Sequence, residues 1–186
     1  MAKSSQQEWK KYGIIAVLLV LFVVVSRVLP HPPNVAPVAA VAIFAGVLLP
    51  RRWALSLPLA AMIVSDLFIG LHDVVAFTWG CFVLIALLSH KFARGSLTPL
   101  IALSSSLGAS TLFFVVTNFG VWLMSGMYTR TFAGLVECYY MAIPFFRNTL
   151  LGDLAYVTIF YLIFLTAKQW VPLSPQISRQ QAGTLE

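Results

Sequence analysis

Six long apolar stretches, separated by short polar or proline-containing segments, constrain the fold of this chain more than any other feature. A helix of about 20 apolar residues can cross a hydrocarbon core that is roughly 30 Å thick. Hydrophobic residues make up 60% of the sequence and charged residues 10%, which is not typical of soluble domains. We therefore expect an all-α membrane protein with six transmembrane helices, at residues 12–29, 35–49, 53–70, 74–89, 97–124 and 150–171.

The segments around these stretches predict one membrane domain with short polar ends. The run at 12–29 is too long for a signal-peptide core and lacks a small-residue cleavage motif, so we expect it to be retained as the first helix. Residues 12–171 would form the transmembrane domain, between a cytoplasmic segment at 1–11 and a disordered cytoplasmic tail at 172–186.

The distribution of Lys and Arg predicts the orientation in the membrane. If the N-terminus is cytoplasmic, nine basic residues lie on the inner side and three, Arg27, Arg130 and Arg147, on the outer side. This is a clear positive-inside bias, so we expect both termini to be cytoplasmic. The net charge of +6 is then a consequence of topology and does not indicate nucleic-acid binding.

Four polar residues inside the apolar stretches converge on the outer side in this orientation. They are Asp66, Cys81, Asn118 and Asp153. A charge inside a bilayer is costly and is usually paired or functional. Cys81 would lie about 10 Å below the outer start of its helix, and a soft sulfur beside carboxylates indicates a ligand site.

Structural roles for the same residues stay open at this point. Asp66 would pair with Arg147 across two helices, and Asp153 would cap the start of the sixth helix, where the helix dipole favours an anion. Cys81 would be an apolar packing residue, or would form a disulfide with Cys138.

The segment at 125–148, between the fifth and sixth helices, is rich in aromatic residues. Tyr and Trp favour membrane interfaces, so this segment is compatible both with an interfacial belt and with a lid. In a binding site, Tyr139 and Tyr140, with Phe77 and Trp79 of the fourth helix, would supply apolar walls.

Five segments together resemble a known family. They are Asn34-Val-Ala-Pro-Val-Ala-Ala, Ser65-Asp-Leu-Phe-Ile-Gly70, Thr78-Trp-Gly-Cys81, Asn118-Phe-Gly-Val-Trp122 and Ala142-Ile-Pro-Phe-Phe-Arg-Asn-Thr-Leu-Leu-Gly-Asp153. In this order they resemble the BtuM family of predicted vitamin B12 transporters, which is related to the S-components of energy-coupling factor (ECF) transporters. The resemblance covers residues 30–165 and implies a six-helix, S-component-like bundle with an outward-facing cobalamin pocket. It also implies a cysteine that ligates the corrin cobalt, and only Cys81 matches that cysteine.

The chemistry of a corrin supports this implication. A corrin fills the equatorial positions of cobalt, so a protein can add only an axial ligand, and thiolate and imidazole are both suitable donors. His31 and His72 lie on the outer side and compete with Cys81 for this role, whereas His90 lies on the inner side. A thiolate on cobalt would weaken a cyanide ligand on the opposite face, so we expect binding to be coupled to decyanation of cyanocobalamin through Cys81.

The resemblance suggests roles for the remaining outer residues. Asp66, Asn118 and Asp153 would form hydrogen bonds with the amide side chains of the corrinoid. Arg147 would contact the phosphate of its nucleotide loop.

The predicted function is therefore cobalamin uptake across the bacterial inner membrane. The sequence has no nucleotide-binding motif, so an ATP-driven step would come from an ECF-type energising module. One alternative is an S-component for another vitamin or for a metal ion, although a bare metal ion needs several converging His or carboxylate ligands. A second alternative is an intramembrane enzyme, although the chain has no Gly-x-Ser-x-Gly, His-Glu-x-x-His or Cys-x-x-Cys motif.

Overall fold

The computed structural model describes the backbone of residues 2–170 and the side chains of residues 12–168. The described backbone forms six α-helices and the connections between them. The helices are α1 (Ala2–Val28), α2 (Val38–Leu48), α3 (Arg51–Ile69), α4 (Val75–Phe92), α5 (Pro99–Met124) and α6 (Phe132–Trp170). No strand occurs within residues 2–170. The prediction of an all-α chain with six helices is confirmed.

The shortest helix, α2, forms the centre of the structure. Its 11 residues span about 16 Å, far less than a hydrocarbon core. Every residue from Val38 to Val47 is buried, because α3, α4, α5 and α6 all contact this helix. Small side chains permit a close approach to α4: a Cβ on Gly46 would lie 2.5 Å from the carbonyl oxygen of Ala86. A helix that is apolar on all sides is typical of a protein core or of a membrane span, and α2, which is too short to span, lies in the core.

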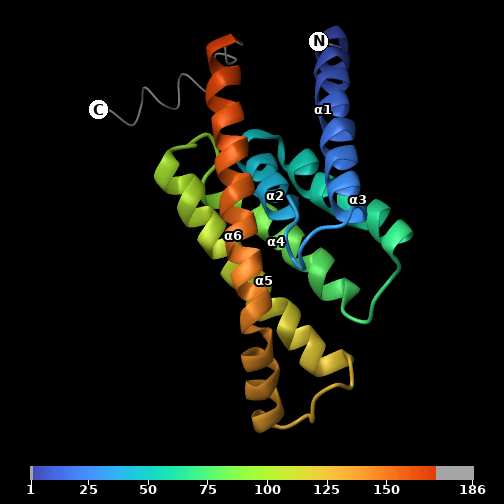
Figure 1. The fold of residues 1–186 in the computed structure, drawn as a ribbon. Helices are drawn as coiled ribbons and strands as arrows, with labels where there is room; N and C mark the ends of the chain where they lie inside the picture. Colours follow the sequence, from blue (N-terminus) through green and yellow to red (C-terminus); the bar gives the residue numbers. More distant parts are fainter. Residues whose placement is uncertain (1, 171–186) are drawn as a thin grey trace.

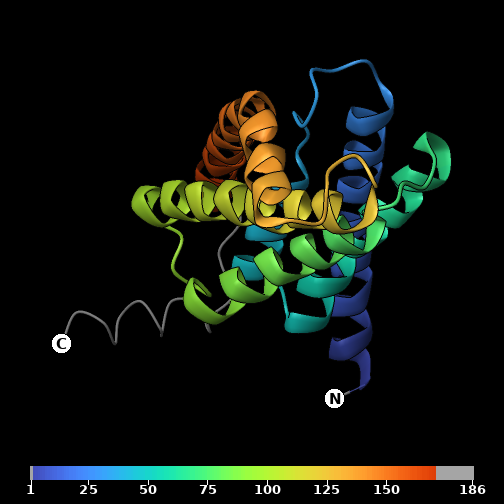
Figure 2. The ribbon, with the colours of Figure 1, turned by 90° about the horizontal axis from the view of Figure 1, so that it is seen from below.

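The other helices surround α2 (Figures 1 and 2). α1 packs on α3, α3 on α4, α4 on α5, and α5 on α6. α1 begins and α6 ends at the same end of the molecule, and the connection between α5 and α6 lies at the opposite end (Figure 1). The α1–α2 and α3–α4 connections face this opposite end as well. All three connections therefore turn away from the start of α1, although only the α5–α6 connection lies at the far end (Figure 1).

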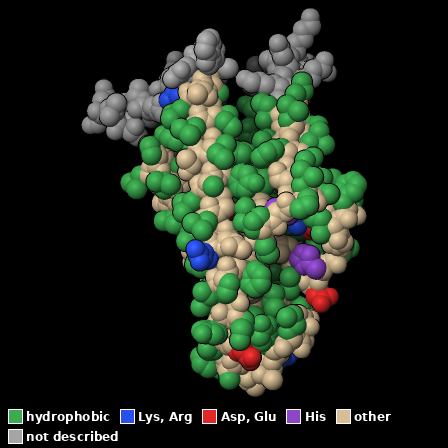
Figure 3. Space-filling view, viewed as in Figure 1, with side chains coloured by type: hydrophobic (Ala, Val, Ile, Leu, Met, Phe, Trp, Pro, Cys, Tyr) green, Lys and Arg blue, Asp and Glu red, His purple; other side chains and the backbone are tan. Residues whose placement is uncertain are grey.

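Four helices, α3, α4, α5 and α6, are long and apolar enough to cross a membrane. The apolar part of α1, Tyr12–Val28, and the whole of α2 are shorter. Many large hydrophobic side chains are exposed, and hydrophobic side chains cover most of the face shown in Figure 3. Soluble monomers rarely expose so much apolar surface. The chain has the helices and the surface of an α-helical membrane protein.

The prediction was wrong about the segment before the sixth helix. α6 begins at Phe132, so only residues 125–131 of the expected connection at 125–148 are non-helical. Pro144 lies inside α6, where proline removes one backbone hydrogen bond. Membrane helices tolerate proline when neighbouring groups satisfy the freed backbone. The 39 residues of α6 span about 58 Å, and with the end of α5 they form a hairpin that projects beyond the other helices (Figure 1).

The first helix also differs from its predicted bounds. α1 begins at Ala2, so helical backbone continues through the polar residues that precede the apolar run. The predicted tail at 172–186 lies outside the described residues.

Candidate ligand-binding cavity

A cavity of about 480 Å³ lies between the projecting α5–α6 hairpin and the rest of the helices. His31 and Asn34 of the α1–α2 connection, His72 of the α3–α4 connection and Tyr128 of the α5–α6 connection all line it. Because these connections all turn away from the start of α1, the cavity lies on that side of the molecule (Figure 1). Its volume is within the usual range for small-molecule sites.

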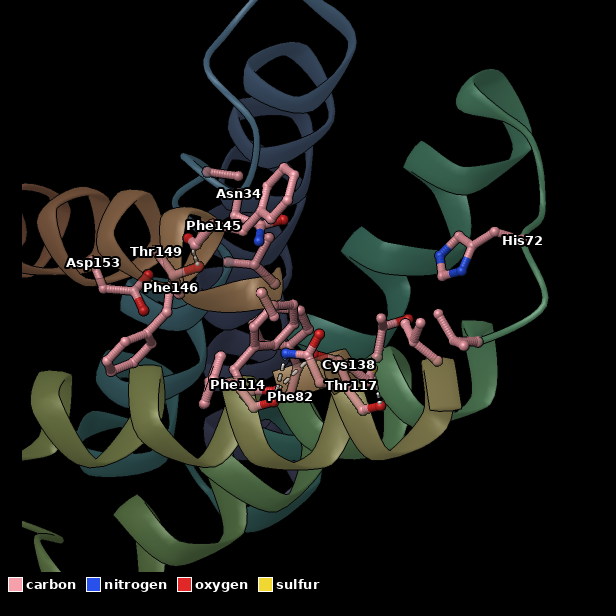
Figure 4. A pocket seen from close by; sticks show the side chains of 18 of the residues that line it. Asn34, His72, Phe82, Phe114, Thr117, Cys138, Phe145, Phe146, Thr149 and Asp153 are labelled. Carbon is pink, nitrogen blue, oxygen red and sulfur yellow. Dashed lines mark hydrogen bonds between the residues drawn. The ribbon is translucent and has the colours of Figure 1, made fainter. Parts of the chain in front are cut away.

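One face of α5 and one face of α6 form the longest wall of the cavity (Figure 4). The lining residues recur at intervals of three and four, which places them on one side of each helix. On α5 they are Phe113, Phe114, Thr117, Asn118 and Val121, and on α6 they are Cys138, Met141, Ala142, Phe145, Phe146, Thr149 and Asp153. The wall is mainly apolar and includes four phenylalanine rings, with amide, hydroxyl, thiol and carboxyl groups placed along it.

Asp153 is the only carboxylate that lines the cavity among the described residues. It is 3% exposed, and its Oδ2 accepts a 2.7 Å hydrogen bond from the Ser110 hydroxyl of α5. Asp153 lies well inside α6, so the alternative in which it caps the start of the sixth helix is wrong. A buried carboxylate with one protein donor keeps capacity for donors on a ligand.

Asp66 does not pair with Arg147, as one alternative had it, but with Arg27. Arg27 Nη1 lies 2.7 Å from Asp66 Oδ1 and also donates to Ser65 Oγ. The indole of Trp79 donates a 2.7 Å hydrogen bond to Asp66 Oδ2. Asp66 itself is 1% exposed and does not line the cavity, whereas Arg27 does.

Cys81 is buried in α4 behind the cavity wall rather than in it. The residues that line the cavity on this helix are Thr78 and Phe82, which lie on either side of Cys81 in the sequence. Cys81 is 1% exposed.

Cys138, the second cysteine, lines the cavity from α6, and its thiol donates to the Asn118 carbonyl oxygen at 3.4 Å. Both cysteines are free, so the alternative of a Cys81–Cys138 disulfide is wrong. One thiol therefore faces the cavity directly, and the other lies behind Phe82 and Thr78.

The remaining predicted residues divide into two groups. Asn118, His31 and His72 line the cavity. Five do not: Phe77 packs on Gly120 and Phe119, Trp79 bonds Asp66, Tyr139 donates to the Val115 carbonyl oxygen, and Tyr140 and Arg147 are exposed.

His90, which was expected on the inner side, is not among the residues that line the cavity. Its Nδ1 bonds the Gly46 carbonyl oxygen at 3.0 Å, and its Nε2 lies 2.7 Å from Arg94 Nη1. This histidine ties the end of α4 to α2.

Sequence reasoning missed Arg27, Cys138 and most of the aromatic wall. The three- and four-residue spacing from Cys138 to Asp153 is visible in the sequence, but it has meaning only if this whole stretch is one helix. Arg27 had been counted only as an outer positive charge.

The cavity combines aromatic walls with sparse polar groups, and no cluster of three or more His, Cys, Asp or Glu that would hold a bare metal ion occurs among the described residues. Asn118 uses its amide nitrogen to bond the Phe114 carbonyl oxygen at 2.8 Å, which leaves its amide oxygen as an acceptor. Such a site suits an organic ligand with a broad apolar face and polar substituents.

Comparison with known proteins gives one match. No curated protein and no solved structure matches the chain. A family model described as "Family of unknown function (DUF6580)" matches residues 7–176, which is most of the chain. This protein therefore belongs to the DUF6580 family, whose function is unknown.

Proposed function

We propose that this protein binds cobalamin in the cavity and carries it across the inner membrane of a bacterium, as an S-component-like bundle of six membrane helices. The resemblance to the BtuM family suggests the substrate. Four membrane-length helices and an aromatic cavity on one side of the bundle support a transport role for an organic ligand.

The position of Cys81 is the observation that carries this proposal. It lies on α4 between Thr78 and Phe82, which both line the cavity. A rearrangement of the wall at this point of α4 would bring the sulfur within reach of a molecule in the cavity. Cys81 would then supply the axial thiolate ligand of cobalt.

The histidines at the mouth are weaker candidates for this ligand. His31 Nδ1 donates to the Leu29 carbonyl oxygen at 2.6 Å, which leaves Nε2 as its metal-binding atom. His31 and His72 are both exposed in connections, where each side chain competes with water. Cys81 lies in a fixed helix and in a dry environment, which favours a single coordination geometry.

The cavity is smaller than the proposed ligand, so ligand binding requires a change in the structure or in how much of the ligand enters. A corrinoid with its nucleotide loop is larger than 480 Å³, so the cavity must widen or the vitamin must protrude from its mouth. Apart from each other, the two helices of the α5–α6 hairpin pack mainly on α2 and α4, and their far ends project beyond the other helices (Figure 1). Outward movement of this hairpin would enlarge the cavity.

Ligation by Cys81 would also act on a cyanide bound to the opposite face of cobalt. When the cobalt–sulfur bond forms, the Cys81 thiol loses its proton, the base of the nucleotide loop leaves the face that the sulfur takes, and the bond between cobalt and cyanide weakens. Cyanide leaves with its electron pair and takes up a proton to form hydrogen cyanide, and water takes the free position. This exchange leaves the oxidation state of cobalt unchanged and needs no reductant.

Absorption spectroscopy tests the proposal. The purified protein should be coloured or should change the spectrum of added cyanocobalamin, and a Cys81→Ser variant should not. A Cys138→Ser variant discriminates the two thiols, because Cys138 faces the cavity but is not the proposed ligand. An unchanged spectrum with wild-type protein over hours, or an equal change with Cys81→Ser, contradicts the proposal.

The proposed uptake of cobalamin requires that the cavity face the outside of the cell. The positive-inside bias supports cytoplasmic termini and an outward-facing cavity. Growth on cobalamin in cells that lack every other uptake route, with and without ECF energising genes, would test whether such a module is a partner. A colourless protein that ignores cobalamin would instead favour an S-component for another vitamin or metal ion, or an intramembrane enzyme.

A further inference from the structure

One of the residues that line the cavity, Arg27, is a cation paired with a buried carboxylate. Arg27 lies in the last turn of α1, and its side chain is 16% exposed and lines the cavity. Its partner Asp66 has a side chain that is 0% exposed, and the second oxygen of that carboxylate is held by Trp79. The carboxylate therefore faces the protein, and the guanidinium is the part of this pair that faces the cavity.

Only one nitrogen of Arg27 is used in these contacts. Nη1 forms the ion pair with Asp66 and donates to Ser65 Oγ, whose own hydrogen goes to the Ala61 carbonyl oxygen at 2.7 Å. Nε and Nη2 have no hydrogen-bond partner within the described part of the chain. The N–H groups of Nε and Nη2 form one edge of the guanidinium plane, and this edge matches two oxygens of a phosphate or carboxylate.

The surroundings of Arg27 favour an anion. Asn34 and His72 line the same cavity, and both have N–H groups that can donate. Asp153 and His72 lie at opposite ends of the cavity (Figure 4). Arg27 belongs to the His72 end, because Asp66 lies in the last turn of α3, just before the connection that contains His72. The cavity thus has an acidic end and a basic end.

We propose that Arg27 is an anion-recognising residue that binds a phosphate ester of the ligand through Nε and Nη2. This inference rests on the proposed function, in which the phosphodiester of the cobalamin nucleotide loop is the group bound. It also orients the vitamin, with the nucleotide loop at Arg27 and the corrin amides toward Asp153. Arg147, which the sequence suggested for the phosphate, is exposed and outside the cavity lining.

Two corrinoids that differ in the phosphate test the assignment. Cobalamin contains the phosphodiester and cobinamide lacks it, and binding is measured in a sugar-based detergent that carries no lipid phosphate. An Arg27→Gln/Asp66→Asn variant removes both charges of the pair, so that no buried carboxylate is left alone. It should bind cobalamin about 10- to 100-fold more weakly than wild type and cobinamide equally well, because hydrogen bonds to a charged group are lost. Equal weakening for both corrinoids would overturn the assignment.

A second variant covers the case in which the double variant does not fold. Arg27→Lys keeps the ion pair with Asp66 but offers no planar edge, so its preference for cobalamin over cobinamide should fall below that of wild type. An unchanged preference overturns the assignment. Arg51→Gln removes an exposed charge at the start of α3, away from the cavity lining, and is the matched control.

Inorganic phosphate separates this inference from the proposed function. If wild type binds neither corrinoid, the cobalamin proposal fails, and the melting temperature in phosphate against chloride at equal ionic strength decides the role of Arg27. A phosphate-dependent increase in wild type that is absent in Arg27→Lys and in the double variant supports an anion site. If phosphate changes the melting temperature of wild type, Arg27→Lys and the double variant equally, or changes none of them, the anion site is refuted.

Discussion

The Ser110 hydroxyl of α5 donates a 2.7 Å hydrogen bond to Oδ2 of Asp153 in α6, and this bond joins the two helices at the cavity wall. Ser110 is 0% exposed and Asp153 is 3% exposed, so water does not easily replace either partner. The bond fixes the carboxylate of the cavity without using all of its acceptor capacity.

A Ser110→Ala substitution should destabilise the protein, because it removes the donor that satisfies Asp153. The expected loss in free energy of unfolding is about 1–3 kcal/mol, read as a lower melting temperature in detergent. Thr111→Ala is the control, since the exposed Thr111 hydroxyl bonds only the Leu107 carbonyl oxygen of its own helix. Adding Asp153→Asn to Ser110→Ala should recover stability. Equal effects of the two single variants would contradict this role of Ser110.

Trp79→Phe should also lower stability, by removing the 2.7 Å hydrogen bond from the indole to Asp66. Asp66 is buried, so its Oδ2 would lose its donor without gaining water, and the expected loss is again about 1–3 kcal/mol. Trp122→Phe removes an indole bond to the Thr129 carbonyl oxygen in an exposed connection, where water can substitute. The melting temperatures of these two variants should therefore differ, and a larger effect at Trp122 would refute the explanation.

Gly46→Ala should separate α2 from α4. A Cβ at this position would lie 2.5 Å from the Ala86 carbonyl oxygen and 2.7 Å from Ser89 Cβ, and the helix backbone cannot move away locally. Overpacking of this kind costs about 1–3 kcal/mol. Gly108→Ala in α5 is the matched control, because a Cβ there meets nothing within 4 Å and alanine favours a helix by up to about 1 kcal/mol. Thermal unfolding of the two variants should shift in opposite directions.

Labelling of single cysteines should reveal the orientation. In a Cys81→Ser/Cys138→Ser background, Asp73→Cys in the α3–α4 connection should react with a membrane-impermeant maleimide in intact spheroplasts. Lys91→Cys near the end of α4 should react only after the membrane is broken. Both side chains are exposed, so access depends on the side of the membrane alone. The reverse pattern would place the cavity on the cytoplasmic side.

Periodicity and apolar length were sufficient to predict the helices, but not the point at which α6 begins. Pro144 and the aromatic residues around it are compatible with a loop in isolation, and only packing against α5 shows that they continue a helix. Phe114, for example, contacts the rings of both Tyr139 and Phe146. Such contacts between distant residues cannot be read from local sequence.

The same limit applies to the candidate site. Asp153 and Asn118 were predicted because polar groups in apolar helices are costly, and both line the cavity. Arg147 was considered as one possible partner of Asp66, whereas the pairing with Arg27 depends on how α1 packs against α3. The rotation of α4 about its axis also depends on helix packing. It places Phe82, and not the adjacent Cys81, in the cavity wall.

The burial of α2 has a consequence for how the chain is made. The ribosome releases α2 before any of the helices that enclose it, and its 11 residues are too few to hold it across a bilayer alone. It must remain sheltered near the insertion machinery until α3 to α6 have followed. α6 is one of the four helices that cover α2. A nascent chain that stops before Phe132 would therefore leave one side of α2 uncovered. Proteases that remove unfinished membrane proteins would recognise such a chain.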